Sequence, residues 1–267
     1  MPLDPALRPW RRPPAPLFRN RLIAAVAALA TLGLAAAASA MTITPVILDM
    51  ETIGRHSTSA IRVENTFAQP LPVEIVVWQL ELDENAGQER IPGDDDWLVF
   101  PPQALIEPGR TQVFRIQWLG DPDLEQGRSY IFSINQLPVQ QAEGSTAVQL
   151  LYNFGVPVSI APPGGAPELA LAELDIERSG NPGERPVVVV ENSGNAHGYL
   201  SGAELSLALY GADGRELWAA DFTREETEAM AGVGLIQPDN RRRFVLPIDL
   251  PPGGQRLEGT IRHVGRR

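Results

Sequence analysis

The chain has 267 residues, a formal net charge of −11 and no cysteine. Its 22 basic residues are all arginine, because the sequence contains no lysine. Such an acidic balance argues against binding to nucleic acid or to an anionic membrane surface. The lack of cysteine excludes disulfides and thiol chemistry.

The first 40 residues have the pattern of a cleaved signal peptide. Arginines between Arg11 and Arg21 precede the apolar run Leu22–Ala38, and Ala38-Ser39-Ala40 forms a small-residue cleavage site. We therefore expect a mature chain that begins at Met41, acts outside the cytoplasm and does not stay inserted in a membrane. A membrane anchor is the weaker alternative, because the run is near the short limit for a span and ends in small residues.

Helical periodicity is almost absent from the rest of the chain, and short alternating runs separated by turn residues predict strands. In the first half the expected strands are Thr42–Leu48, Ser59–Glu64, Val73–Leu82, Trp97–Phe100, Thr111–Leu119, Tyr130–Gln136 and Ala147–Ile160. Glycine, proline, asparagine and aspartate mark the breaks between them. Seven short strands at this spacing are typical of a β-sandwich.

The string Ala161-Pro-Pro-Gly-Gly-Ala-Pro167 has no strand pattern and predicts a linker. We place one domain at 41–162 and a second at 163–267. The strands expected after the linker are Leu169–Ile176, Val187–Glu191, Ala203–Tyr210, Glu216–Ala220, Arg242–Leu246 and Leu257–His263, with a helical turn at Glu225–Met230. Val63-Glu-Asn-Thr66 is echoed by Val190-Glu-Asn-Ser193, as two related sandwiches or chance would produce.

Residues 148–160 carry the strongest signal for function. Apolar residues occupy every second position: Val148, Leu150, Tyr152, Phe154, Val156, Val158 and Ile160. Side chains alternate along a strand, so these residues share one face. The row exceeds a typical strand of about 5–6 residues, and a small domain rarely has core enough to cover it all. Part of it is therefore predicted to await a partner, which makes strand donation a candidate function.

Catalytic motifs are missing from the sequence. None of His56, His197 and His263 is spaced with another histidine or a carboxylate as a metal-ligand set. There is no nucleophile elbow, phosphate loop or dinucleotide-binding glycine pattern. The acidic cluster Asp94–Asp96 is interpreted as a solvated loop, with a calcium site as the alternative. We expect a protein that is not an enzyme and that holds no cofactor or metal.

Several motifs occur in an order and spacing found in one known family. They are Ser59–Asn65, Pro101-Pro102, Ile106–Gly109, Gln112–Arg115, Tyr130–Pro138, Val156–Val158, Pro162, Val190–His197, Ile236–Asp239 and Arg243–Pro247. Together they resemble the periplasmic pilus-assembly (fimbrial) chaperones of the chaperone–usher pathway, in its archaic branch. The resemblance covers nearly all of residues 41–265.

The resemblance implies an all-β fold of two immunoglobulin-like sandwiches arranged as a boomerang. It implies a periplasmic chaperone that lends its seventh strand to a pilus subunit lacking its last strand, and that passes the subunit to an outer-membrane usher. The donor residues would be Val148, Leu150, Tyr152 and Phe154. Alternatively, the whole row is core of the first domain. A secreted adhesin or binding module of two sandwiches and a secreted hydrolase are the rival functions.

The family anchors the C-terminal carboxylate of the subunit with an arginine on the first strand and a lysine on the donor strand. This chain has no lysine, and Pro157 falls near the lysine position. A carboxylate buried without a cation is costly, so another arginine is expected to serve. Arg62 and Arg115 would face outward on neighbouring strands and are the candidates. Ordinary solvated surface arginines are the alternative.

Overall fold

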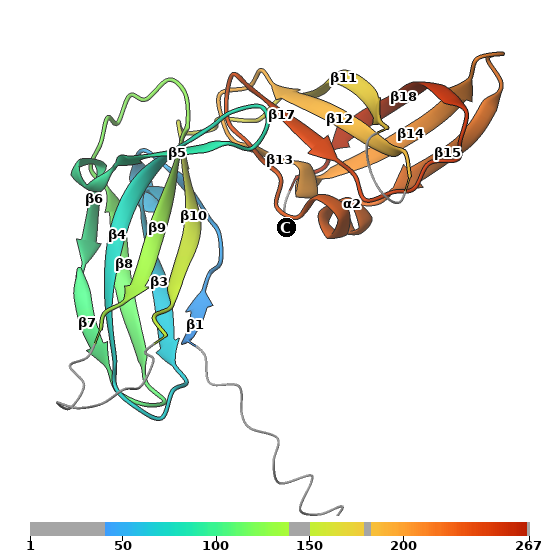
Figure 1. Cartoon of the computed structure of the whole chain (residues 1–267). Coiled ribbons are helices and arrows are strands. Elements are labelled where there is room, and N and C mark those ends of the chain that lie inside the picture. Colours follow the sequence, from blue (N-terminus) through green and yellow to red (C-terminus); the bar gives the residue numbers. More distant parts are fainter. Residues whose placement is uncertain (1–40, 139–149, 179–182, 266–267) are drawn as a thin grey trace, which may run out of the picture. The chain divides into compact units, whose positions relative to one another are not determined.

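The computed structural model describes residues 41–138, 150–178 and 183–265. The predicted signal peptide and Val148 therefore lie outside the described residues. Strands dominate the described chain, as expected (Figure 1). Before the predicted linker they are β1 (Met41–Thr44), β2 (Leu48–Glu51), β3 (Thr58–Asn65), β4 (Leu71–Leu82), β5 (Gln88–Pro92), β6 (Trp97–Phe100), β7 (Gln103–Ile106), β8 (Thr111–Trp118), β9 (Arg128–Gln136) and β10 (Asn153–Ala161).

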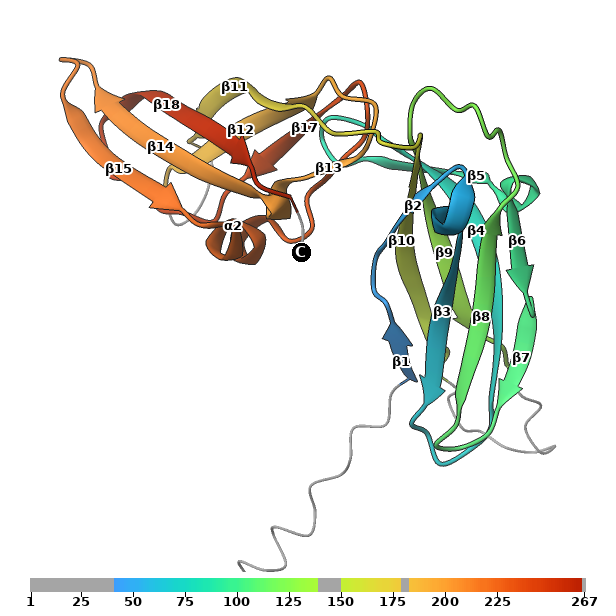
Figure 2. The same ribbon diagram turned by 180° about the vertical axis from the view of Figure 1, so that it is seen from behind.

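These ten strands form two sheets. One sheet has the order β1-β3-β8-β6, and these strands can be followed in Figure 2. The other has the order β2-β10-β9-β4-β5, with β7 also pairing with β4. Buried residues of both sheets share one core, in which the rings of Trp97, Trp118, Tyr130 and Phe132 meet edge to face. This is the sandwich that the alternating runs predict.

The first expected strand was wrong as a single element. Thr42–Leu48 is divided into β1, which pairs with β3, and the end of the run in β2, which pairs with β10 of the other sheet. Pro45 lies at the break. Proline has no amide hydrogen for a ladder and is tolerated where a strand ends, so the chain leaves one sheet here and enters the other.

The strands after the linker form three more sheets. They are β11 (Leu169–Glu177), β12 (Arg185–Asn192), β13 (Gly198–Tyr199), β14 (Ala203–Gly211), β15 (Glu216–Phe222), β16 (Leu235–Ile236), β17 (Asn240–Val245) and β18 (Gly254–His263). The sheet orders are β11-β12-β17, β15-β14-β18 and β13-β16. Val188 and Val190 of β12 share a core with Leu205 and Leu207 of β14, so the two larger sheets pack face to face.

The expected helical turn is the helix α2 (Arg224–Ala231). Thr223 precedes it and accepts a hydrogen bond from the amide of Glu226, while the Glu226 carboxylate accepts one from the amide of Thr223. This reciprocal pair is a capping box, which satisfies amides that have no partner inside the helix. Within the described ranges, no helix is long and apolar enough to cross a membrane.

The echoed Val-Glu-Asn segments end in two asparagines with the same structural role. The Asn65 amide nitrogen donates to the carbonyls of Gln69 and Ile106, both at 2.8 Å. The Asn192 amide nitrogen donates to the carbonyls of Ala196, four residues on, and Ile236, at 2.8 and 3.2 Å. Asn65 ends β3 and Asn192 ends β12, and both side chains are buried. The echo therefore reflects a repeated structural device.

Candidate functional site

The strand β10 is paired along only part of its length on one side. Its partner β9 runs antiparallel along 153–160, whereas β2 pairs only with 158–161; the three strands are labelled in Figure 2. Among the described residues, 153–157 therefore have no second strand. The edge of the sheet is open over these five residues, and such an edge is a template for another strand.

Single hydrogen bonds show which backbone groups face this edge. The amide of Gln136, on β9, donates to the carbonyl of Tyr152 at 2.9 Å, and the amide of Thr52 donates to the carbonyl of Ala161 on the opposite side at 3.0 Å. Because successive residues point their backbone groups to opposite edges, those of Asn153, Gly155 and Pro157 face outward. Pro157 lacks an amide hydrogen and forfeits no ladder bond in this position. The open edge thus offers the amides and carbonyls of Asn153 and Gly155, which are two donors and two acceptors.

The apolar row changes from exposed to buried along this strand. Leu150 is 71% exposed, and Tyr152 and Phe154 are each 38% exposed. Val156 and Val158 are buried in the core between the sheets, as is Ile160. Only the last half of the row is therefore core. The interpretation of the entire row as core does not hold for Leu150, Tyr152 and Phe154, while Val148 is outside the described residues.

The predicted strand starts too early. Ala147 lies outside the described residues, and β10 begins at Asn153, so Leu150–Tyr152 has no strand geometry. Tyr152 is nevertheless held near the sheet, because its ring lies 5.7 Å from that of Phe67. Its amide also donates to the side-chain oxygen of Gln136 at 3.3 Å. The exposed half of the row is thus tethered at Tyr152 without being covered.

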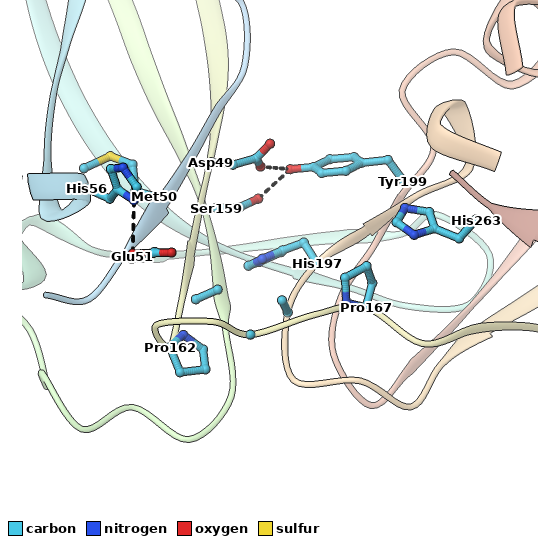
Figure 3. A pocket seen from close by; sticks show the side chains of 13 residues that line it. Asp49, Met50, Glu51, His56, Ser159, Pro162, Pro167, His197, Tyr199 and His263 are labelled. Carbon is cyan, nitrogen blue, oxygen red and sulfur yellow. Dashed lines mark hydrogen bonds and ion pairs between the residues drawn. The ribbon is translucent and has the colours of Figure 1, made fainter. Parts of the chain in front are cut away.

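The covered end of β10 is fastened by a tyrosine from the other group of strands. In Figure 3 the hydroxyl of Tyr199 lies between Asp49 of β2 and Ser159 of β10. The tyrosine donates to the Asp49 carboxylate, and its oxygen is 2.9 Å from the Ser159 hydroxyl. This arrangement links β13, β2 and β10 at the point where the edge is closed. No local sequence pattern indicates this contact, since the two partners are 40 and 150 residues from Tyr199.

All three histidines of the chain line the pocket of about 300 Å³ that surrounds this contact (Figure 3). His56 is 3.1 Å from the carboxylate of Glu51. His197 is buried, and burial lowers its pKa to about 4, opposed by a hydrogen bond to the backbone of Arg128. Nε2 of His197 has no hydrogen-bond partner in the described chain. Burial thus favours the neutral form of the His197 imidazole.

Arg62 and Arg115 lie on neighbouring antiparallel strands, β3 and β8. Arg62 is opposite Val113 and Arg115 is opposite Ala60, so the two arginines are diagonal neighbours on the outward face. Both are exposed, and neither forms an ion pair with a described residue. Their sheet is not the sheet that contains β10. Their role as a carboxylate anchor stays a prediction.

The acidic cluster is part of the fold. Asp94 accepts a hydrogen bond from the amide of Val77 at 3.3 Å, and Asp96 accepts one from the hydroxyl of Tyr130. Arg128 lies 3.7 Å from the Asp96 carboxylate. Burial, together with Asp96, raises the pKa of Tyr130. Within the described residues, no group of three or more histidine, aspartate or glutamate side chains could hold a metal ion.

The fold is similar to that of solved chaperone structures. A chain in the crystal structure of the CsuC–CsuE chaperone–tip adhesion subunit pre-assembly complex, from archaic chaperone–usher Csu pili of Acinetobacter baumannii, is 15% identical, with a TM-score of 0.51 over 83% of this chain and 92% of that one. The class 5 fimbriae chaperone CfaA is 12% identical, with a TM-score of 0.50 over 85% of this chain and 100% of that one. No protein-family model and no curated protein sequence matches the chain.

The chain has the fold of the pilus chaperones. The expected resemblance is thus confirmed for the fold, and the matched structures come from an archaic and a class 5 system. The assignment to the archaic branch stays a prediction. At these identities the likeness concerns architecture alone.

Proposed function

We propose that the protein is a periplasmic chaperone that binds pilus subunits by lending them β10, and that it delivers them to an outer-membrane usher. The observation that carries the proposal is the division of one apolar row into a buried half and an exposed half, at the place where the sheet edge is open. An incomplete sandwich could pair with the edge and cover Leu150, Tyr152 and Phe154.

The energetics favour binding without a chemical step. Fully burying an exposed leucine, tyrosine or phenylalanine stabilises a complex by roughly 1.5–3 kcal/mol. The outward groups of Asn153 and Gly155 add main-chain hydrogen bonds, each of about 1 kcal/mol net. Release by exchange of one strand for another needs no catalysis, which is consistent with a protein that is not an enzyme.

The proposal includes two domains, with boundaries at 41–162 and 163–267. Two observations support it. The buried residues before the linker and those after it form different core clusters. In addition, Asn65 and Asn192 perform the same task in their respective groups of strands. The proposal also includes a signal peptide at 1–40, which would place the mature chain in the periplasm.

The rival function is an adhesin or binding module that recognises its ligand with loops. The two functions differ in what they require of Leu150. Strand donation needs an apolar side chain at this position, whereas recognition by loops elsewhere does not.

The test is co-expression with a pilin-type subunit that lacks its last strand. Leu150→Asp should lower the recovered subunit at least tenfold, because it places an unpaired charge in an apolar groove. The matched control is Leu98→Asp, an exposed leucine on β6 of the other sheet. It should leave recovery unchanged.

A second control is the same subunit with its missing strand fused to it, which should not bind. Both variants should keep the thermal unfolding temperature of the wild type, because both leucines are exposed. Full recovery of the subunit with a folded Leu150→Asp variant would overturn the proposed function.

A further inference from the structure

A second cavity, of about 390 Å³, lies against the outer face of the sheet that contains β10. Its walls are mainly apolar and include Leu80, Leu82, Ile131, Pro157, Leu235 and Phe244. Two arginines of β17, Arg242 and Arg243, line this cavity, and Arg242 is only 9% exposed. A cation buried among apolar walls requires an explanation, because its desolvation is costly unless it is paired.

The guanidinium of Arg242 is incompletely satisfied. Its Nη1 donates to the carbonyl of Leu235 at 3.0 Å, and the group lies over the Phe244 ring at 5.7 Å. Its Nε is buried without an acceptor in the part of the chain described. No carboxylate of a described residue forms an ion pair with it. Burial lowers the pKa of Arg242, and the more distant Asp83 only partly opposes this.

Its two neighbours on β17 are paired. Arg241 lies 3.7 Å from Glu84 and 3.6 Å from Glu173, and Arg243 lies 3.4 Å from Glu177. Strand alternation places the middle arginine on the opposite face of the sheet from the other two. In a chain with 33 acidic residues, a buried arginine without one of them is available for a carboxylate from another molecule.

We propose that the Arg242 cavity binds an apolar carboxylate, with the carboxylate on the guanidinium and the attached apolar group against Leu80, Ile131 and Leu235. Arginine suits this ligand, since its planar guanidinium binds carboxylates through paired hydrogen bonds. The ligand could be a free aliphatic acid or the C-terminal end of a partner chain.

The second source rests on the proposed function. Pro157 is both the last residue of the open edge and part of the cavity wall. A strand paired with the edge could therefore bring its end toward Arg242. Of the arginines near β10, this one is buried with an unsatisfied nitrogen, whereas Arg62 and Arg115 are exposed on the other sheet.

The test is calorimetric titration of the purified mature protein with octanoate and with octanamide, its neutral counterpart. Octanoate should bind and octanamide should bind at least tenfold more weakly. Arg242→Met should reduce octanoate affinity at least tenfold, while the matched control Arg241→Met should change it less than threefold. Equal affinity of wild type and a folded Arg242→Met variant, or the lack of any octanoate binding, would overturn the proposal.

Stability separates a binding role from a structural one. Replacing a buried, unpaired cation by an apolar side chain of similar length is often neutral or stabilising. Arg242→Met should therefore keep or raise the thermal unfolding temperature while losing octanoate. A large loss of stability would indicate a structural arginine and contradict the assignment. In that case Arg242→Gln is the second variant, and unchanged octanoate affinity of Arg242→Gln would also contradict the assignment.

The source of the carboxylate is resolved by peptides. A peptide ending in an apolar residue with a free carboxylate is compared with its C-terminal amide. Preference for the acid by tenfold or more supports a chain end, and binding of octanoate alone supports a free acid. Leu150→Asp should leave octanoate affinity unchanged, so failure of strand donation and failure of this site give different results.

Discussion

Replacing His197 by glutamine should make the folded protein less sensitive to acid. His197 lines the pocket beside the contact of Tyr199 with Asp49 and Ser159, and it is buried with Nε2 unpartnered among the described residues. The carboxylate and histidine side chains that line the pocket with His197 are Asp49 and Glu51 of β2, His56 after β2 and His263 at the end of β18. The His197 ring itself is hydrogen-bonded to the backbone of Arg128 of β9. None of these carboxylates is hydrogen-bonded to the His197 ring in the described contacts.

The magnitude follows from the pKa difference between the two states. Burial lowers the pKa of His197 from 6.5 to about 4 in the folded protein. Between these values the unfolded chain binds the proton and the folded chain does not, so the free energy of unfolding falls as the pH falls. One pKa unit corresponds to about 1.4 kcal/mol, which predicts a loss of about 2.5 kcal/mol between pH 7.5 and pH 4.5.

The assay is urea unfolding at several pH values in this range. Other groups titrate as well, so the informative quantity is the difference between wild type and His197→Gln. This difference should change by about 2.5 kcal/mol across the range. His56→Gln, a change at an exposed histidine of the same pocket, is the control and should follow the wild type within about 0.5 kcal/mol. Parallel curves for wild type and His197→Gln would show that the burial of His197 does not cause the acid sensitivity.

Three further predictions concern stability. Tyr199→Phe removes the hydroxyl between β2 and β10 and should cost about 1.5–3 kcal/mol in urea unfolding. Asn65→Ala and Asn192→Ala should each cost about 2–4 kcal/mol, because each leaves buried backbone groups unpaired; a cost near zero for either would contradict the shared role. Val158→Ala should cost about 2 kcal/mol, whereas Phe154→Ala should cost less than about 1 kcal/mol yet weaken subunit binding in a pull-down.

The sequence predicts those features that depend on period and local turn chemistry. The alternation in residues 148–160 identifies one apolar row, and the Pro/Gly string separates two groups of strands with different cores. The alternation does not show where the edge of β10 changes from paired to open. The open edge lies where β2 stops pairing with β10, and β2 is about 110 residues earlier in the chain. The strand β5 was missed because all five of its residues are exposed and show no apolar alternation.

Two residues of the candidate sites could not be predicted from the sequence for a related reason. Tyr199 and Arg242 act through partners that are distant in the sequence or absent from the chain. The run Arg241-Arg242-Arg243 contains three identical side chains, and only the position of Glu84, Glu173 and Glu177 in space distinguishes the middle one. Strand alternation alone predicts opposite faces, but it does not predict which face is buried.

The most direct test of strand donation is amide hydrogen exchange at Asn153 and Gly155, the two amides that face the open edge of β10. Their exchange should be measured in the free protein and with a bound subunit that lacks its last strand. Strand donation predicts fast exchange in the free protein and at least hundredfold slower exchange in the complex, as in a paired strand. Unchanged exchange at both amides in a saturated complex would contradict it.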